Sequence, residues 1–183
     1  MKKLFLLTLV LALVVPLGGC QRGVEKFDTS SASVIRWFDY GIDPHSDDTE
    51  TRECEISAFP DVTFLRDYTV LYVLDSTAKT KLYSGMPIWS VYFCDLNGDS
   101  QPEICSTVSV GSGIVDNRIL VYDYAAKACY ELEDRSVYDY ALNIKDGVLI
   151  YEKRNYRDNY QDDKIIETGT LRIEDGELRT CPQ

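Results

Sequence analysis

Histidine is almost missing from this chain of 183 residues, because His45 is the only one. Zinc peptidases of the H-E-x-x-H type need two histidines, and a Ser-His-Asp hydrolase needs one beside its serine. No two cysteines are spaced as C-x-x-C, so zinc and redox sites have little support. The pattern Gly111-Ser112-Gly113 lacks the G-x-G-x-x-G spacing of a phosphate-binding loop.

Positive charge is also scarce, with 19 Lys and Arg against 30 Asp and Glu. A chain of this balance repels phosphate backbones, so nucleic acid is not an expected partner. The many carboxylates make chance pairs common, so a pair of acids does not by itself indicate a glycosidase. The length suits one domain with a sizeable core.

The N-terminal segment has the pattern of an export signal. Lys2 and Lys3 precede an apolar run from Leu4 to Leu17, and two glycines then lead to Cys20. The run is shorter than the roughly 20 residues of a membrane-spanning helix, and its parts are those of a secretory signal. We expect residues 1–19 to form a signal helix that is removed, which leaves 164 residues with a formal charge of −13, since two lysines and no acid are lost.

The segment Leu17-Gly18-Gly19-Cys20 resembles the lipobox of bacterial lipoproteins. In that family the cysteine sulfur receives diacylglycerol, a dedicated peptidase cuts before it, and the new amine is often acylated, commonly with palmitate. The resemblance implies lipidation of Cys20 and a position on the extracytoplasmic side of the cell membrane, because two or three acyl chains anchor stably. The alternative is an ordinary signal with a cysteine by chance.

Residues 20–52 are mixed and polar, and we expect most of them to form a tether between the lipid and the domain. Four apolar or aromatic residues depart from this polar pattern: Ile35, Trp37, Phe38 and Tyr40. A cluster of such residues usually packs against other parts of a protein. A short helix or an added strand is expected there.

Residues 53–183 are predicted to be an all-β domain. They contain short runs of β-branched and aromatic residues between turn residues, and none keeps a helical period for three turns. The predicted strands are 55–58, 62–66, 69–74, 80–84, 89–94, 103–110, 117–124, 128–133, 138–144, 148–154 and 165–173. We expect an antiparallel meander in a sandwich, a small barrel or a propeller-like sheet.

Two Asp-Gly pairs, Asp146-Gly147 and Asp175-Gly176, predict tight hairpin turns because both residue types tolerate positive φ. Strict alternation in the segments 121–124 and 138–140 predicts strands with one aromatic and one acidic face.

The loop D-L-N-G-D-S-Q-P-E lies between two of the predicted strands. Its odd positions, one to nine, hold Asp95, Asn97, Asp99, Gln101 and Glu103. Calcium takes six to eight oxygen ligands at about 2.3–2.6 Å, which such a loop can supply without Cys or His. We predict a calcium site that binds weakly, at about 10⁻⁴–10⁻³ M. The alternative is a surface turn, because Asp, Asn, Gly and Ser also favour turns.

This D-x-N-x-D-x-x-x-E loop resembles the calcium loops of FG-GAP and VCBS repeats, which occur in integrin-type β-propellers. The resemblance implies ligation by the side chains of Asp95, Asn97, Asp99 and Glu103 and by the carbonyl of Gln101. The sequence departs from that family at Ser100, where a glycine is usual, and in having one such loop instead of several. It is not an EF-hand, because position 12 is a serine instead of a glutamate.

Three segments of the chain, GMPIWSVYFCDLNGDSQPEICSTVSVGSGIVDNRILVYDY, YDYALNIKDGVLI and ETGTLRIEDGEL, span Gly85 to about Glu177. They resemble an extracytoplasmic module of Firmicutes that occurs in small lipoproteins and beside membrane metallopeptidases of the penicillin-sensing antirepressor type. Because H-E-x-x-H is absent, the resemblance implies kinship with a sensing or scaffold portion.

Five cysteines beyond Cys20 make an odd number, so at least one thiol stays free or pairs between chains. The spacing of Cys94 and Cys105, on either side of the acidic loop, permits a disulfide. Eight of the 13 tyrosines lie between residues 122 and 160. They either cover a half-buried sheet or form a binding face. Tyr156 and Tyr160, in a predicted hairpin tip, are the expected ligand surface.

These features predict a lipid-anchored extracytoplasmic module that binds or senses a ligand and catalyses nothing, with calcium as its candidate cofactor. Its expected partners are the membrane, through Cys20, a membrane or envelope protein, or a carbohydrate. Two alternatives stay open: a carboxylate-based hydrolase acting on envelope or carbohydrate substrates, and a structural component of an envelope assembly.

Overall fold

The computed structural model describes residues 23–42, 51–111, 116–133, 138–155 and 164–183. Within these ranges the chain forms strands and turns and no helix, which confirms the all-β prediction. It follows that no helix of the described part could span a membrane. The predicted signal helix, Cys20, Tyr156 and Tyr160 lie outside the described residues.

The strands are arranged in three sheets. The first sheet contains β1 (Glu25–Phe27), β3 (Arg52–Ile56), β4 (Thr63–Arg66), β5 (Val70–Leu74) and β6 (Lys79–Ser84), in that order. The central sheet has the order β10 (Ala128–Leu132), β9 (Asn117–Asp123), β8 (Glu103–Ser109), β7 (Ile88–Cys94) and β2 (Val34–Asp39). The third sheet contains β11 (Tyr138–Lys145), β12 (Val148–Asn155), β13 (Ile165–Glu174) and β14 (Glu177–Pro182).

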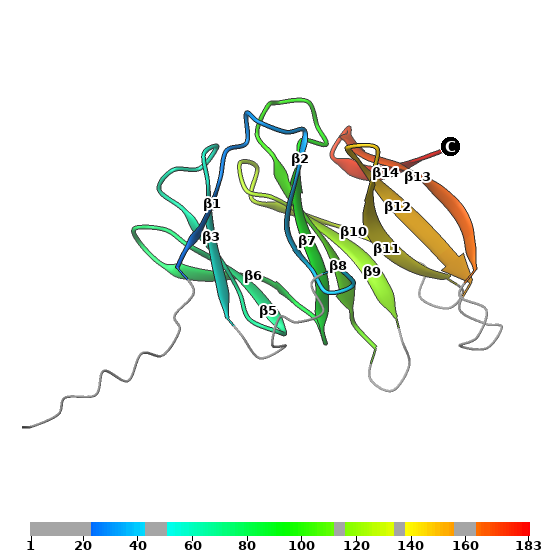
Figure 1. The fold of residues 1–183 in the computed structure, drawn as a ribbon, viewed down its shortest axis with the longest axis horizontal. Helices are drawn as coiled ribbons and strands as arrows, with labels where there is room; N and C mark the ends of the chain where they lie inside the picture. The colour runs from blue at the N-terminus through cyan, green and yellow to red at the C-terminus, as the bar shows by residue number, and fades with distance from the viewer. Residues whose placement is uncertain (1–22, 43–50, 112–115, 134–137, 156–163) are drawn as a thin grey trace, which may run out of the picture.

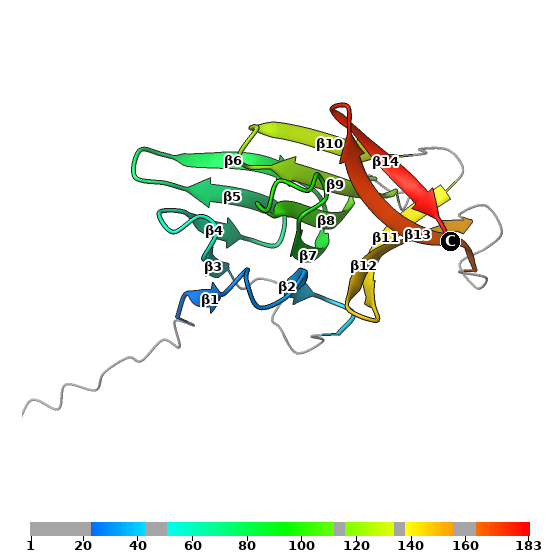
Figure 2. The same ribbon diagram turned by 90° about the horizontal axis from the view of Figure 1, so that it is seen from above.

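Each sheet is built on an antiparallel meander of four consecutive strands: β3 to β6, β7 to β10 and β11 to β14. Figure 1 shows the first and third sheets on opposite sides of the central one, and Figure 2 shows the same order from above. The antiparallel meander of the prediction is thus present in each of the three sheets, two of which contain five strands and one four.

The central sheet is buried on both faces. One core cluster joins it to the first sheet, with Val91, Phe93 and Ile104 facing that side. A second cluster joins it to the third sheet, with Tyr92 and Cys105 facing the other way. Consecutive residues of a strand point to opposite faces, so apolar residues at both alternating positions require cover on both sides. All seven residues of β8 are accordingly buried.

The segment before residue 53 contributes two strands to the sheets. β1 pairs in parallel with β3, and β2 pairs with β7 at the edge of the central sheet. Trp37 and Phe38 in β2 are only 2% and 1% exposed. The aromatic cluster thus forms the added strand that was one expectation, and burial of its large rings stabilises the packing of this strand. The folded domain begins at Glu25, within the range 20–52 that was predicted to be mostly tether.

The predicted strand runs from 55 to 173 each correspond to a strand of the structure, with small differences at the ends. The short β1 and the polar β14 were not predicted. Both predicted hairpin turns are confirmed, with positive φ at Asp146 and Gly147 (52° and 77°) and at Asp175 and Gly176 (55° and 75°). Two successive residues of positive φ match the right-handed twist of the flanking strands.

Candidate metal centre

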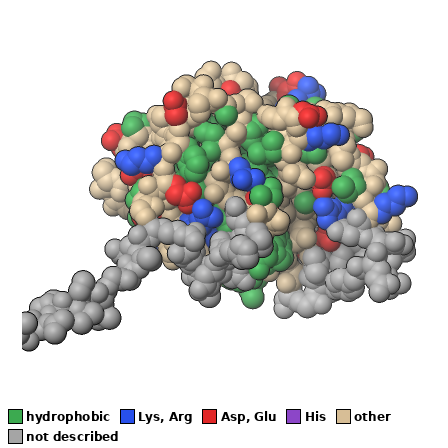
Figure 3. Space-filling model, in the orientation of Figure 1, with side chains coloured by type: hydrophobic (Ala, Val, Ile, Leu, Met, Phe, Trp, Pro, Cys, Tyr) green, Lys and Arg blue, Asp and Glu red, His purple; other side chains and the backbone are tan. Residues whose placement is uncertain are grey.

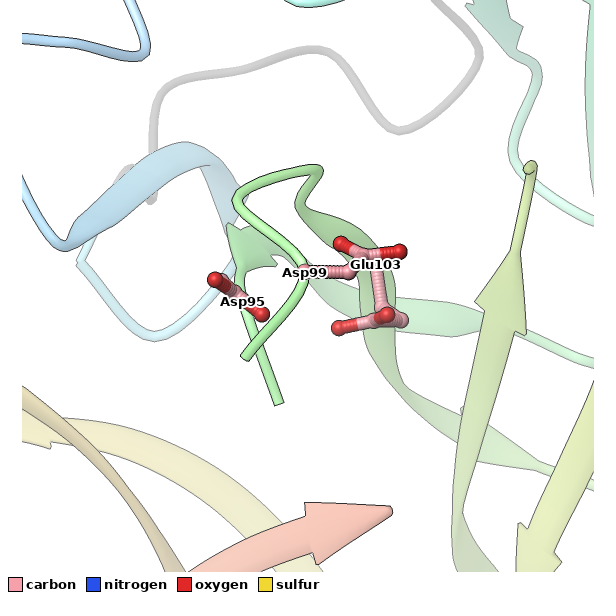
Figure 4. Close-up of side chains that lie close together, drawn as sticks. All are labelled: Asp95, Asp99 and Glu103. Atoms are coloured by element: carbon pink, nitrogen blue, oxygen red, sulfur yellow. The ribbon is translucent and has the colours of Figure 1, made fainter. Parts of the chain in front are cut away.

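The acidic loop connects β7 to β8, and the strand pairing holds its two ends together. Cys94, the last residue of β7, lies opposite Glu103, the first residue of β8. Figure 4 shows Asp95 and Asp99 on the loop and Glu103 at the start of the strand. One carboxylate oxygen from each of these three residues lies within 4.8 Å of the other two. Carboxylate oxygens this close repel one another unless a proton or a cation lies between them.

Backbone amides of the loop orient the Asp95 carboxylate. Gly98 N–H donates to Asp95 Oδ1 at 2.7 Å, and Ser100 N–H donates to Asp95 Oδ2 at 2.9 Å. The chain curls around this side chain because both donors have positive φ, 80° at Gly98 and 69° at Ser100. Ser100 therefore adopts the left-handed conformation that a glycine would take at lower cost.

The other predicted ligands lie farther along the same loop. Asp99 N–H donates to Asn97 Oδ1 at 2.8 Å, and Gln101 N–H donates to Asp99 Oδ1 at 2.7 Å. The Asn97 amide also approaches Asp123 Oδ2 at 3.5 Å. The structure therefore brings three of the five predicted ligands together as carboxylates, and ligation by Asn97 and Gln101 stays a prediction.

Glu103 differs from the two aspartates because its side chain is buried, with 1% of the residue exposed. Its Oε2 accepts a hydrogen bond of 2.6 Å from Leu96 N–H. Burial raises the pKa of the Glu103 carboxyl to about 7, against the lowering effect of backbone hydrogen bonds and with a further increase from the charges of Asp123 and Asp95. A bound cation would oppose this shift, because positive charge favours the ionised form.

Asp123 was not predicted to belong to this site. It ends β9, is 5% exposed and accepts a hydrogen bond of 2.7 Å from Ala126 N–H. The pairing of Ile104 with Tyr122 places Asp123 beside the start of β8. The alternation in residues 121–124 did indicate an acidic face, but a sequence does not show that the third sheet covers that face.

The cysteines that flank the loop are not opposite each other, because Cys105 pairs with Tyr92 and Cys94 with Glu103. All five cysteines of the described part are free thiols, and Cys105 and Cys54 are buried. The described tyrosines of the predicted aromatic region also favour the packing alternative: Tyr140 and Tyr151 are 5% and 0% exposed and belong to the second core cluster.

Acidic and basic side chains are interspersed on the molecular face shown in Figure 3. Arg118 forms ion pairs with three acids, Asp116, Glu131 and Glu133, at N–O distances of 2.6–2.7 Å.

Comparison with family models, curated proteins and solved structures gave no match. The resemblances to lipoproteins, to calcium-loop repeats and to the Firmicutes module therefore stay predictions.

Proposed function

We propose that this chain is a lipid-anchored, extracytoplasmic β-sheet module that binds or senses a ligand, and that its acidic loop holds a calcium ion. The observation that carries the calcium assignment is the convergence of Asp95, Asp99 and Glu103, whose carboxylate oxygens lie within 4.8 Å of one another. A site made only of oxygen ligands suits a hard cation such as calcium.

The loop is already organised to receive an ion. Asp95 and Asp99 are exposed, so a cation can reach them from solvent, and Glu103 lies beneath them. The backbone hydrogen bonds to Asp95 use one lone pair on each oxygen and leave others for a cation. Fixed carboxylates that already face one another lower the ordering cost of binding.

The position of the loop explains what a bound ion would stabilise. Leu96, within the loop, is buried in the core cluster between the central and third sheets. Its carbonyl accepts a hydrogen bond of 2.9 Å from Ile173 N–H in β13. An ion that holds the loop in this conformation therefore also supports the contact between the two sheets.

The anchor in this proposal is the acylated Cys20, supported by the lipobox-like segment and the basic and apolar residues before it. Four residues, 21–24, separate Cys20 from the start of β1. At no more than about 3.6 Å per residue, they keep the start of the domain close to the membrane surface. A domain this close to the membrane surface can contact a membrane or envelope protein, which is therefore the partner we propose.

Burial of Glu103 favours binding over hydrolysis. A carboxylate hydrolase needs two acids that both reach the substrate, one on each side of the scissile bond. Asp95 and Asp99 are exposed, but the carboxyl with the raised pKa is 1% exposed and hydrogen-bonded to Leu96. The group best suited to be a general acid is thus the one least open to a substrate.

A calcium titration followed by thermal unfolding tests the proposal. At about 10 mM calcium, a site with Kd of about 10⁻⁴–10⁻³ M stabilises the fold by roughly 1–3 kcal/mol, which raises Tm by about 3–10 °C. The double variant Asp95→Ala/Asp99→Ala should lose this shift. Asp61→Ala/Glu177→Ala removes the same charge from exposed positions elsewhere and should keep it. A wild-type Tm that does not change with calcium, or an equal Tm shift in both double variants, excludes the site.

A further inference from the structure

A pocket of about 730 Å³ lies beside the acidic loop. Its walls come from three places in the chain: the connection between β1 and β2, the acidic loop, and the strands β12 and β13 of the third sheet. Small-molecule sites in proteins typically measure about 300–1,000 Å³. This pocket is thus large enough for a ligand of several residues or rings.

Seven of the sixteen described lining residues are Ala, Val, Leu or Ile, and six are Ser, Thr or Asp. Leu149 and Leu171 from the third sheet line the pocket together with Val34 and Ile35 from β2. Val148 at its edge is 46% exposed, which is unusual for an apolar side chain next to a concave surface. An aliphatic group placed here would remove this apolar surface from water, which favours binding.

Among the described residues of the lining, Asp95 is the only charged side chain, and none is Lys or Arg. Both of its oxygens are already oriented by backbone N–H groups of the loop. Each oxygen keeps a lone pair for a further donor. With Asp99 and Glu103 next to it, the carboxylate creates a negative potential at one end of an otherwise neutral pocket.

We infer that this pocket binds a cationic, aliphatic ligand, namely the free amino terminus of a short peptide with aliphatic side chains. The ammonium group pairs with Asp95, and the side chains contact Val148, Leu149 and Leu171. An anionic ligand is disfavoured because no lining side chain compensates its charge. The inference gives the proposed binding role a site and rests on that role, but it does not require calcium.

The test compares leucyl-leucinamide with its N-acetyl derivative, whose amino terminus carries no charge, by calorimetric titration in EDTA. A hydrogen bond to a charged group contributes about 1.5–3 kcal/mol, so we expect the acetylated peptide to bind at least about tenfold more weakly. Val148→Lys places a positive charge at the edge of the pocket and should weaken leucyl-leucinamide by about tenfold or more. Ile165→Lys changes a similarly exposed apolar residue, 42% exposed, that does not line the pocket, and should leave the affinity unchanged.

Equal affinity for the two peptides, no effect of Val148→Lys, or no binding of leucyl-leucinamide would each overturn the inference. Circular dichroism of both lysine variants establishes that each is folded. The calcium proposal is judged separately by its Tm shift. If the protein shows the Tm shift with calcium but binds no peptide in EDTA, the calcium proposal stands and the peptide inference is rejected. If it binds the peptide but shows no Tm shift, the peptide inference stands and the calcium proposal is rejected.

Discussion

The backbone N–H of Leu96 donates a hydrogen bond of 2.6 Å to Oε2 of Glu103. The carbonyl of the same leucine accepts one of 2.9 Å from Ile173 in the third sheet. The buried carboxyl of Glu103 in the central sheet is therefore connected to the third sheet by two hydrogen bonds that share one residue, Leu96. Since the Leu96 side chain also lies in the core between them, the charge on Glu103 acts on the packing of the two sheets.

The raised pKa of Glu103 predicts a specific pH dependence in calcium-free protein. The carboxyl has a pKa of about 7 in the fold, raised mainly by burial from an ordinary 4.5. Between these pH values the folded chain holds a proton that the unfolded chain has lost, so stability decreases as pH rises through this window. Glu103→Gln has no proton to lose, and its stability should exceed that of wild type progressively toward pH 7, by roughly 1–3 kcal/mol.

Urea unfolding of both proteins in EDTA at pH 5, 6, 7 and 8 measures this difference. The neighbours Asp95 and Asp123 are the same in both proteins, so the difference in stability between the two proteins reports on Glu103. Calcium should bind more strongly to wild type at pH 8 than at pH 5, because it needs the ionised carboxylate. A difference between the two proteins that is constant with pH would contradict the buried, protonated Glu103.

The second prediction concerns β2. A short helix and an added strand were both expected for this segment, and the buried side chains of β2 allow the strand to be tested. Phe38 is 1% exposed and lies under the guanidinium of buried Arg66, with 3.7 Å from Cζ to the ring centroid. Phe38→Ala removes both the apolar contact and this cation–π contact, and should cost about 3–5 kcal/mol of unfolding free energy. Arg36→Ala changes an exposed residue two positions earlier in the same strand and should cost less than about 1 kcal/mol.

Chemical denaturation of these two variants and of wild type measures both costs. If residues 25–39 were a tether, neither substitution would change the denaturation midpoint, and equal small effects would argue for that organisation.

The strands from β3 to β13 could be predicted because their residues alternate or form short β-branched runs between turn residues. The acidic loop could be predicted because its ligand types recur at odd positions. β14 could not, since its residues ELRTCP are mostly polar and include a proline. It is a strand only because β13 offers a free edge for hydrogen bonding, which is a property of the neighbouring strand.

Asp123 and Glu103 illustrate a second limit. Sequence spacing placed Glu103 in the loop, but it did not show that this residue begins a strand, β8, that is buried along its whole length. A strand buried on both faces is also less distinctive in sequence than one with a polar face, because its hydrophobic run does not alternate. The pocket beside the loop depends on three distant segments and is invisible to any local pattern.

The third prediction concerns Gly169 in β13. A Cβ built at this position would lie 2.2 Å from the Cys181 carbonyl oxygen and 2.8 Å from Pro182 Cα, both in the backbone of β14. Gly169→Ala should therefore displace β14 and cost about 1–3 kcal/mol, the usual range for overpacking. Gly23→Ala, where a Cβ meets nothing within 4 Å, is the matched control and should leave stability unchanged in a thermal melt. Equal melting temperatures for both variants would show that β14 does not approach β13 this closely.

The last prediction tests the anchor independently of the sheet domain. Cells that express the full chain are grown with a radiolabelled fatty acid, and the protein is recovered from membrane and soluble fractions. Wild type should carry the label and sediment with membranes, because two or three acyl chains bind a bilayer stably. Cys20→Ala removes the acceptor sulfur and should abolish the label. Cys129→Ala, which removes an exposed thiol of the folded domain, should keep both label and membrane association. Label that persists in Cys20→Ala, or unprocessed protein in the cytosol of wild-type cells, would show that Leu17-Gly18-Gly19-Cys20 is not a lipidation signal.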